Sequence, residues 1–255
     1  MLALRKGRLA SRGLGIATAG LALSLGMTSA ASAAPAGVGG GAFGVSADVT
    51  ALGVHVVVGQ TPSVTLPTPG GSAVPLTSHL ASLAGPPVFS AGVLDVSTVG
   101  TPAGGTVLSS ADVANLSVPP LLLTSGVIHS SCSATGAGAG GTTTLVGLTI
   151  GTTVVAANPG IGTVIPIAGV ATVTLNEQIP TTTLGLPGIT VNAVHIRLLP
   201  GLGSLGSGDI IVSQSRCDLI GSTPVPVGAI GGVVLTGVLG VLFAGYQFRK
   251  RRETA

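Results

Sequence analysis

The sequence predicts an all-β domain, with a β-sandwich-like architecture and a β-solenoid as the alternative, followed by one C-terminal transmembrane helix. Three observations predict it. Valine and threonine, which favour strands, are abundant, while only 7% of the residues are charged. Glycine and proline, at 42 and 17 residues, interrupt the chain at the short intervals typical of turns between strands. A charge-free apolar run of bilayer length lies near the C-terminus.

The N-terminus has the three parts of a secretory signal peptide over residues 1–33. Basic residues up to Arg12 precede an apolar stretch from Leu14 to Met27, and small residues follow. Cleavage between Ala33 and Ala34 would release the mature chain. An uncleaved anchor helix is the alternative, but the 14-residue apolar stretch is shorter than the roughly 20 residues that a membrane span requires.

The C-terminus predicts a membrane anchor. Residues 227–248 contain no charge, and a helix of that length matches the hydrocarbon core of a bilayer. Four basic residues follow at the start of the predicted cytoplasmic tail, 249–255, as the positive-inside rule requires of a stop-transfer segment. They are Arg249, Lys250, Arg251 and Arg252. We therefore expect a single-pass protein of the cell membrane with its N-terminal domain outside the cell.

Small residues recur at every fourth position of the predicted span, which places them on one helix face. They are Gly228, Gly232, Thr236, Gly240 and Ala244. Such a face allows two helices to approach closely and predicts a homo-oligomer. The alternative is that this spacing arises from the glycine-rich and alanine-rich composition alone.

Between the two ends, residues 42–220 are predicted to form the extracellular β domain. Residues 34–41 are expected to be a flexible N-terminus, and 221–226 a short proline-containing stalk. Runs rich in valine and threonine, separated by turn residues, supply the candidate strands. They include GVSADV, GVHVVVG, SVTLP, GVLDVSTV, VLSSADVANLSV, GVIHSSCS, GTTTLVGLTI, GVATVTLNE, GITVNAVHIRLL and GDIIVSQSRC. No repeat of fixed period is present, which disfavours the solenoid.

The two cysteines, Cys132 and Cys217, both fall in the predicted extracellular part, where the environment is oxidising. A disulfide between them would close a loop of 84 residues and contribute on the order of 4 kcal/mol. Two free thiols or a reactive site are the alternatives. The cysteines are too far apart in sequence for a zinc or redox motif.

Charge and motifs exclude several functions. The central region carries six acidic residues and two arginines, so nucleic acid is not an expected partner. Two glycine-rich stretches match G-x-G-x-x-G but run into strand-like sequence, so no dinucleotide cofactor is expected. The four histidines are widely separated, without metal-ligand spacing or a recognisable nucleophile nearby. We therefore expect no catalytic, cofactor or metal site.

A hairpin predicted around the loop PTTTLGLPG contains Glu177, His195 and Arg197, which together could form a site. If residues 170–177 pair with 189–199, Glu177 lies near Thr190, and Arg197 is roughly 23 Å away at about 3.3 Å per residue. That register argues against a joint site. The next hairpin places Arg197 near Asp209, which predicts a structural ion pair between them.

Several of these segments resemble the choice-of-anchor P family of secreted proteins from high-GC Gram-positive bacteria. The runs are VTLNEQ, ITVNAVHIRLL, GDIIVSQSRC, VLSSADVANLSV and SSCSAT. The resemblance implies a shared extracellular domain joined to one of several C-terminal attachment devices, and it supports the cysteine pairing. It supplies no catalytic residues.

The expected function is a structural or interaction module of the cell envelope, without catalytic activity. The predicted stalk is short enough to keep the domain near the membrane or inner cell wall, beside wall polymer or envelope proteins. The alternative is a carbohydrate-binding module or a wall-modifying enzyme. Against it, the predicted domain has no tryptophan or tyrosine to stack on sugar rings, and its carboxylates lack the pairing of a glycosidase.

Overall fold

The computed structural model describes residues 35–51, 53–86, 88–200 and 206–221. Most of these residues lie in antiparallel strands of three sheets, and the described part of the chain has one 3-10 turn and no α-helix. None of its helices is long and apolar enough to cross a membrane. The predicted all-β, sandwich-like architecture is confirmed for these residues, while the predicted span 227–248 lies outside them.

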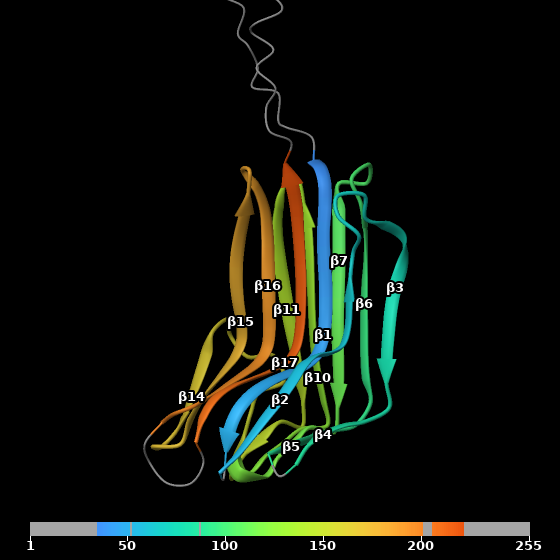
Figure 1. Ribbon diagram of the computed structural model, residues 1–255. Coiled ribbons are helices and arrows are strands. Elements are labelled where there is room, and N and C mark those ends of the chain that lie inside the picture. Colours follow the sequence, from blue (N-terminus) through green and yellow to red (C-terminus); the bar gives the residue numbers. More distant parts are fainter. Residues whose placement is uncertain (1–34, 52, 87, 201–205, 222–255) are drawn as a thin grey trace, which may run out of the picture. The chain divides into compact units, whose positions relative to one another are not determined.

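Two large sheets face each other and a smaller one lies at one end (Figure 1). Sheet A has the order β14 (Thr163–Ile167), β15 (Ala171–Thr183), β16 (Leu186–Leu198), β17 (Ser207–Gly221), β1 (Pro35–Ala51) and β2 (Val54–Thr65). Sheet B has the order β11 (Gly138–Val146), β10 (Val127–Thr135), β7 (Thr106–Ala114), β6 (Leu94–Thr101) and β3 (Ser72–Leu80). Sheet C has the order β13 (Thr153–Val154), β12 (Thr149–Ile150), β9 (Leu123–Thr124), β8 (Ser117–Val118), β5 (Phe89–Ala91) and β4 (Leu83–Gly85), with the 3-10 turn Pro119–Leu121 between β8 and β9.

Sheet B forms because its strands alternate between apolar and polar residues. Along β6, β7 and β10 every second residue is buried, which is the pattern of a strand with one face on a core. The buried positions carry valine, leucine, isoleucine, alanine and cysteine, together with small hydroxyl side chains. Serine, threonine, aspartate and histidine occupy most positions of the other face.

The first and last described strands are neighbours in sheet A. Strand β1 pairs with β17 from Pro35 opposite Gly221 onward, and it pairs with β2 on its other side. The expectation of a flexible segment at 34–41 was therefore wrong for residues 35–41, which lie inside a sheet. Glycine is needed there because a Cβ on Gly40 would come within 3 Å of side chains of sheet B.

The long strands of sheet A switch their buried face from one side of the sheet to the other. The switch occurs at the same line in each strand. At this line β1, β15, β16 and β17 each bury consecutive residues, which interrupts their alternation. The residues on the line are Gly44, Asn176, Ala193 and Ser213. We call this line the crease. Because a one-residue shift reverses the facing of every later side chain, all four strands must shift together to keep their hydrogen bonds.

The crease divides the interior of the sandwich. On the side of the chain ends, sheet A packs on sheet B through a core that includes Val38, Val107, Val191 and Leu219. On the other side a larger core joins sheet A to both sheet B and sheet C, with Leu94, Ile128 and Ile196 fully buried. Figure 1 shows the strands of sheet A bending away from sheet B toward the end with β4, β5 and β14.

Candidate functional site

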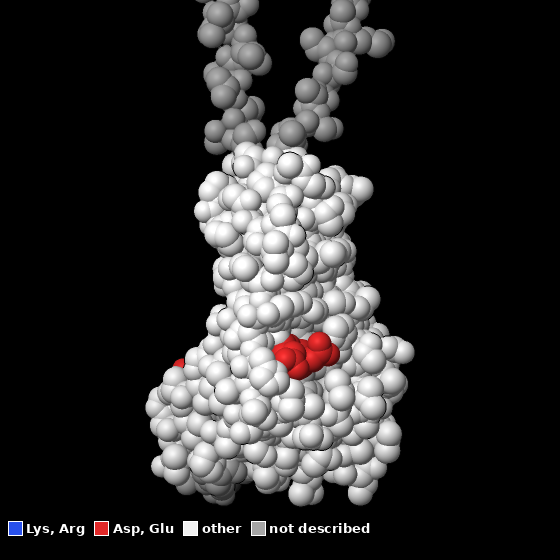
Figure 2. Space-filling model, turned by 90° about the vertical axis from the view of Figure 1, so that its right-hand side faces the viewer, with Lys and Arg blue, Asp and Glu red and all other residues white. Residues whose placement is uncertain are grey.

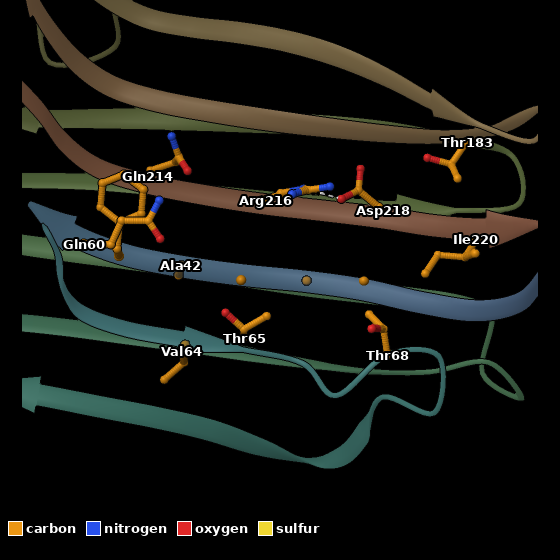
Figure 3. Close-up of a pocket in the computed structure, with 14 residues that line it drawn as sticks. Ala42, Gln60, Val64, Thr65, Thr68, Thr183, Gln214, Arg216, Asp218 and Ile220 are labelled. Atoms are coloured by element: carbon orange, nitrogen blue, oxygen red, sulfur yellow. Dashed lines mark hydrogen bonds and ion pairs between the residues drawn. The ribbon is translucent and has the colours of Figure 1, made fainter. Parts of the chain in front are cut away.

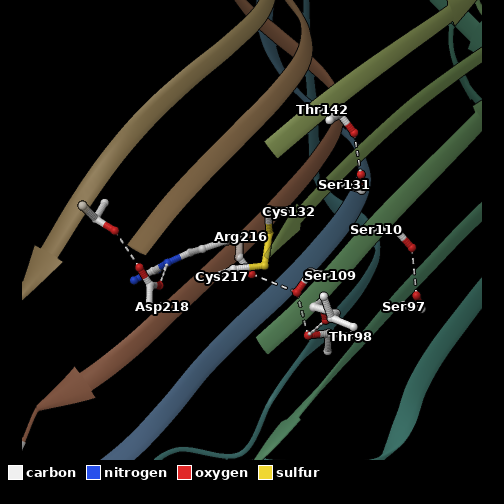
Figure 4. Close-up of a disulfide and its surroundings, with 12 residues drawn as sticks. Ser97, Thr98, Ser109, Ser110, Ser131, Cys132, Thr142, Arg216, Cys217 and Asp218 are labelled. Carbon is white, nitrogen blue, oxygen red and sulfur yellow. Dashed lines mark hydrogen bonds and ion pairs between the residues drawn. A yellow bond between two sulfur atoms is a disulfide. The ribbon is translucent and has the colours of Figure 1, made fainter. Parts of the chain in front are cut away.

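The disulfide predicted between Cys132 and Cys217 is present and joins the two large sheets. Cys132 lies on β10 and Cys217 on β17, their Cα atoms are 6.0 Å apart, and both are buried. Beside it, Ser109 of β7 donates a hydrogen bond of 2.9 Å to the carbonyl of Arg216 (Figure 4). These two links fix the position of β17 on sheet B, and with it the residues that β17 presents to solvent.

The residues on either side of Cys217 point away from the core. Asp218 is almost buried, with a side chain that is 6% exposed, whereas the Arg216 side chain is 60% exposed. The Arg216 Nε donates to one oxygen of Asp218, and Thr181 donates to the other at 2.6 Å. Gly188 lies directly opposite Asp218 on β16 and leaves room for this carboxylate. The carboxylate therefore holds the exposed guanidinium in place.

A groove of about 300 Å³ runs along the outer face of β1 beside this pair. Its floor is formed by Gly39 and Gly41, and Arg216 lies on its β17 side. Figure 3 shows Thr65 and Thr68 on the opposite side of β1 from Arg216 and Asp218. We call it the glycine groove. Because Gly39 and Gly41 carry no side chains, the groove leaves room over this part of β1 for a ligand.

At the crease the glycine groove meets a network of polar side chains. Gln214, which lines the groove, donates to Asn192 at 2.6 Å, and Asn192 donates to Glu177 at 2.7 Å. The same Glu177 oxygen lies 3.0 Å from Nδ1 of His195. On the other side of the ring, His195 Nε2 lies 3.0 Å from Asp209. Hydrogen bonds thus connect the groove with the outer face of sheet A beyond the crease.

This network corrects the prediction that Glu177, His195 and Arg197 are kept apart. Glu177 lies opposite Asn192, two residues further along β16 than Thr190. As a result the Glu177 carboxylate reaches His195, which also contacts the partner of Arg197. The predicted pair of Arg197 and Asp209 is confirmed, with the two residues directly opposite and Nε to Oδ1 at 3.3 Å.

The ring of His195 lies between two carboxylates and is only 14% exposed. An ionised carboxylate accepts hydrogen bonds and donates none, so both ring nitrogens must be donors when both acids are ionised. Both ring nitrogens of His195 are thus engaged, and the ring links Glu177 on one side to Asp209 on the other.

A second polar row crosses the outer face of sheet B. Asp95 of β6 lies directly opposite Asp112 of β7, and His79 and His129 flank them on the neighbouring strands. Each histidine contacts its nearer aspartate through Nδ1, at 2.8 Å for His129 and Asp112. Figure 2 shows acidic side chains grouped on the side that carries β3 and β6, surrounded by uncharged residues.

The hydrogen bond between His129 and Asp112 raises the pKa of His129 above its usual value. Partial burial of the ring opposes this shift, and the negative charge of Asp112 adds to it. The imidazolium form is therefore favoured at this position relative to a free histidine.

Hydroxyl side chains form the next row of this face. Ser97 pairs with Ser110 at 2.9 Å, and Ser131 with Thr142 at 2.8 Å (Figure 4). These residues line a broad groove of about 640 Å³, whose other end is apolar at Val99 and Leu108. The hydroxyl pairs satisfy one another, so this face presents fewer unused hydrogen-bonding groups than its composition suggests.

Several predicted site residues lie outside the described residues. These are the cleavage pair Ala33 and Ala34, the small-residue face Gly228, Gly232, Thr236, Gly240 and Ala244, and the basic cluster Arg249, Lys250, Arg251 and Arg252. Within the described ranges, no three histidine, cysteine, aspartate or glutamate side chains are grouped closely enough to hold a metal ion.

Sequence reasoning missed the glycine groove, although a signal for it exists. In GVGGGAFG the glycines at 37, 39 and 41 alternate, which in a strand places all three on one face. Comparisons with protein-family models, with curated proteins and with solved structures found no match. The site must therefore be interpreted from its own chemistry.

Proposed function

We propose that this chain is a single-pass membrane protein of the cell envelope whose β domain is a non-catalytic interaction module that binds wall polymer through the glycine groove. The groove carries this proposal. It places a guanidinium on one side of β1 and threonine hydroxyls on the other. These groups match the hydroxyl, amide and carboxylate groups of a wall polymer of sugars and short peptides.

The position of the groove supports a ligand near the membrane. Gly39 is four residues from Pro35, or about 13 Å along the strand. Pro35 pairs with Gly221, and the proposed anchor begins six residues later, at residue 227. The groove is therefore close to the end of the domain from which the proposed anchor would continue, which supports a module that works in the inner wall. The same attachment agrees with the resemblance to the choice-of-anchor P family.

The test is co-sedimentation of the full chain, in a non-ionic detergent, with isolated cell walls from which protein has been removed. Saturable binding by the wild type is expected. Gly39→Val should weaken binding about tenfold or more, because the new side chain occupies the floor of the groove, where its Cβ would meet its nearest neighbour at an ordinary 3.6 Å.

Gly140→Val is the matched control. Gly140 lies on the outer face of β11, and a Cβ there has open space around it. This variant should bind walls like the wild type. Absence of binding by the wild type, or equal loss in both variants, would contradict the proposal and direct the search toward protein partners.

A further inference from the structure

All four histidines of the chain lie beside carboxylates of neighbouring strands. The pairs are His55 with Asp48, His79 with Asp95, His129 with Asp112, and His195 with both Glu177 and Asp209. In addition, two pairs of aspartates face each other directly, Asp95 with Asp112 on sheet B and Asp48 with Asp209 on sheet A. Like charges in directly opposed positions destabilise a sheet unless they are compensated.

The charges of the two outer faces balance only when the histidines are protonated. The row on sheet B has two aspartates, so its net charge is −2 with neutral histidines and 0 with two imidazoliums. The row on sheet A has three carboxylates and Arg197, which also gives −2 with neutral histidines and 0 with both protonated. The pair of Arg216 and Asp218 adds no net charge to either face.

We infer that the domain is a pH-responsive module: protonation of the histidines that lie against the opposed carboxylates removes the net negative charge of both outer faces and makes the fold more stable. The inference is independent of the proposed ligand. It rests on the placement of the four histidines against opposed carboxylates, which no requirement of the core explains.

The direction of the effect follows from the partners of each histidine. Protonation makes the histidine in each contact a cationic donor and so places a positive charge beside the opposed aspartates. His129 faces Asp112 on β7 and the uncharged Thr144 on β11, and His79 faces Asp95 on β6. On sheet A, His55 faces Asp48, whereas His195 faces Glu177 and Asp209 with Arg197 on its own strand.

The sign can be worked out for His129, whose pKa is raised in the folded state. The stabilisation is complete below the unfolded pKa, which is about 6.5, and it is lost as the pH rises through the higher folded value. Stability should therefore decline as the pH rises from below about 6.5 through the folded pKa of His129.

The experiment is urea unfolding of the full chain in a non-ionic detergent, followed by circular dichroism at a series of pH values. The urea concentration at the unfolding midpoint of the wild type should decrease as the pH is raised from below about 6.5 through the folded pKa of His129. The double variants His79→Gln/His129→Gln and His55→Gln/His195→Gln should each lose part of this fall. Thr144→Ala replaces an uncharged residue in the same row as His129. Its urea midpoint should depend on pH as that of the wild type does.

A midpoint that is constant or rises over this range would overturn the inference. So would double variants that retain the full wild-type dependence. If a double variant does not fold, NMR titration of the four imidazoles in the wild type decides the question. The inference is supported if the imidazoles of the folded chain titrate at higher pH than those of the urea-unfolded chain. It is rejected if they titrate at the same pH or a lower one.

Discussion

Ser213 on β17 lies opposite Gly44 on β1, where both strands exchange the face that they bury. Ser213 has a φ of +58°, and its Oγ donates a hydrogen bond of 2.7 Å to the carbonyl of Ala111 in sheet B. Asn176, at the same line on β15, also has a positive φ of +50°. The crease is thus held by short polar residues that tolerate this backbone conformation and that bond to neighbouring segments.

We expect Ser213→Ala to lower the free energy of unfolding by about 1–2 kcal/mol, because it removes a buried hydrogen bond and keeps the backbone strain. Ser213→Val should cost more, since a β-branched residue is poorly tolerated at positive φ. Urea unfolding measures both. Ser215→Ala is the control, because Ser215 Oγ is buried on the same face of β17 without a hydrogen-bond partner within the described residues. A loss for Ser215→Ala equal to that of Ser213→Ala would contradict this account.

The disulfide should contribute strongly to stability. Its cysteines are 85 residues apart, so replacing both with alanine is expected to cost about 4 kcal/mol. Reduction of the wild type should produce a similar loss in urea unfolding. The reductant should leave the Cys132→Ala/Cys217→Ala variant unchanged, and any effect on that variant would show that the reductant acts elsewhere.

Gly188 should not accept a side chain. A Cβ at this position would collide with the Asp218 carboxylate and the Thr181 hydroxyl, so Gly188→Ala is expected to destabilise the fold by about 1–3 kcal/mol. Gly39→Ala is the comparison, because its Cβ would meet Asp218 at an ordinary 3.6 Å. Thermal unfolding of both variants tests the difference. Equal melting temperatures would argue against the close packing of Gly188 on Asp218.

Asp112→Asn should lower the pKa of His129 relative to the wild type. The substitution removes the hydrogen bond to a carboxylate and its charge, while the burial that disfavours the imidazolium remains. An NMR titration of the His129 imidazole measures the shift. Asp48→Asn, on the other large sheet, should leave the His129 titration unchanged. A pKa that Asp112→Asn does not alter would assign the shift to another group.

The fold class was predictable because composition and alternation act locally, whereas the register of the hairpin from β15 to β16 was not. The segment PTTTLGLPG was expected to be a loop, yet all but two of its residues lie in the strands. The turn is only Leu184 and Gly185, both with positive φ. This two-residue turn sets Glu177 opposite Asn192, and nothing in the strand composition indicates where such a turn lies.

The disulfide was predictable from the oxidising compartment that the sequence predicts, and the ion pair of Arg197 with Asp209 was predictable from spacing. The polar network was not, because it depends on the crease, where four strands that are distant in sequence shift together. Asn192 appears in the sequence as an ordinary polar residue of a strand. It is 3% exposed, and it bonds to Glu177 and Gln214 from the two neighbouring strands.

The pairing of β1 with β17 also determines when sheet A can be completed. Along the chain, β1 is made first and β17 last of the described strands, and between them lie all the strands of sheets B and C. Until Ser207 to Gly221 is available, β1 has only β2 beside it, and the groove has only one of its two walls. Completion of sheet A therefore requires β17. Folding then depends on contacts between residues far apart in the sequence, and such folding is slow. A chain with this order of strands can be threaded through a narrow passage from its N-terminus without sheet A forming on the way.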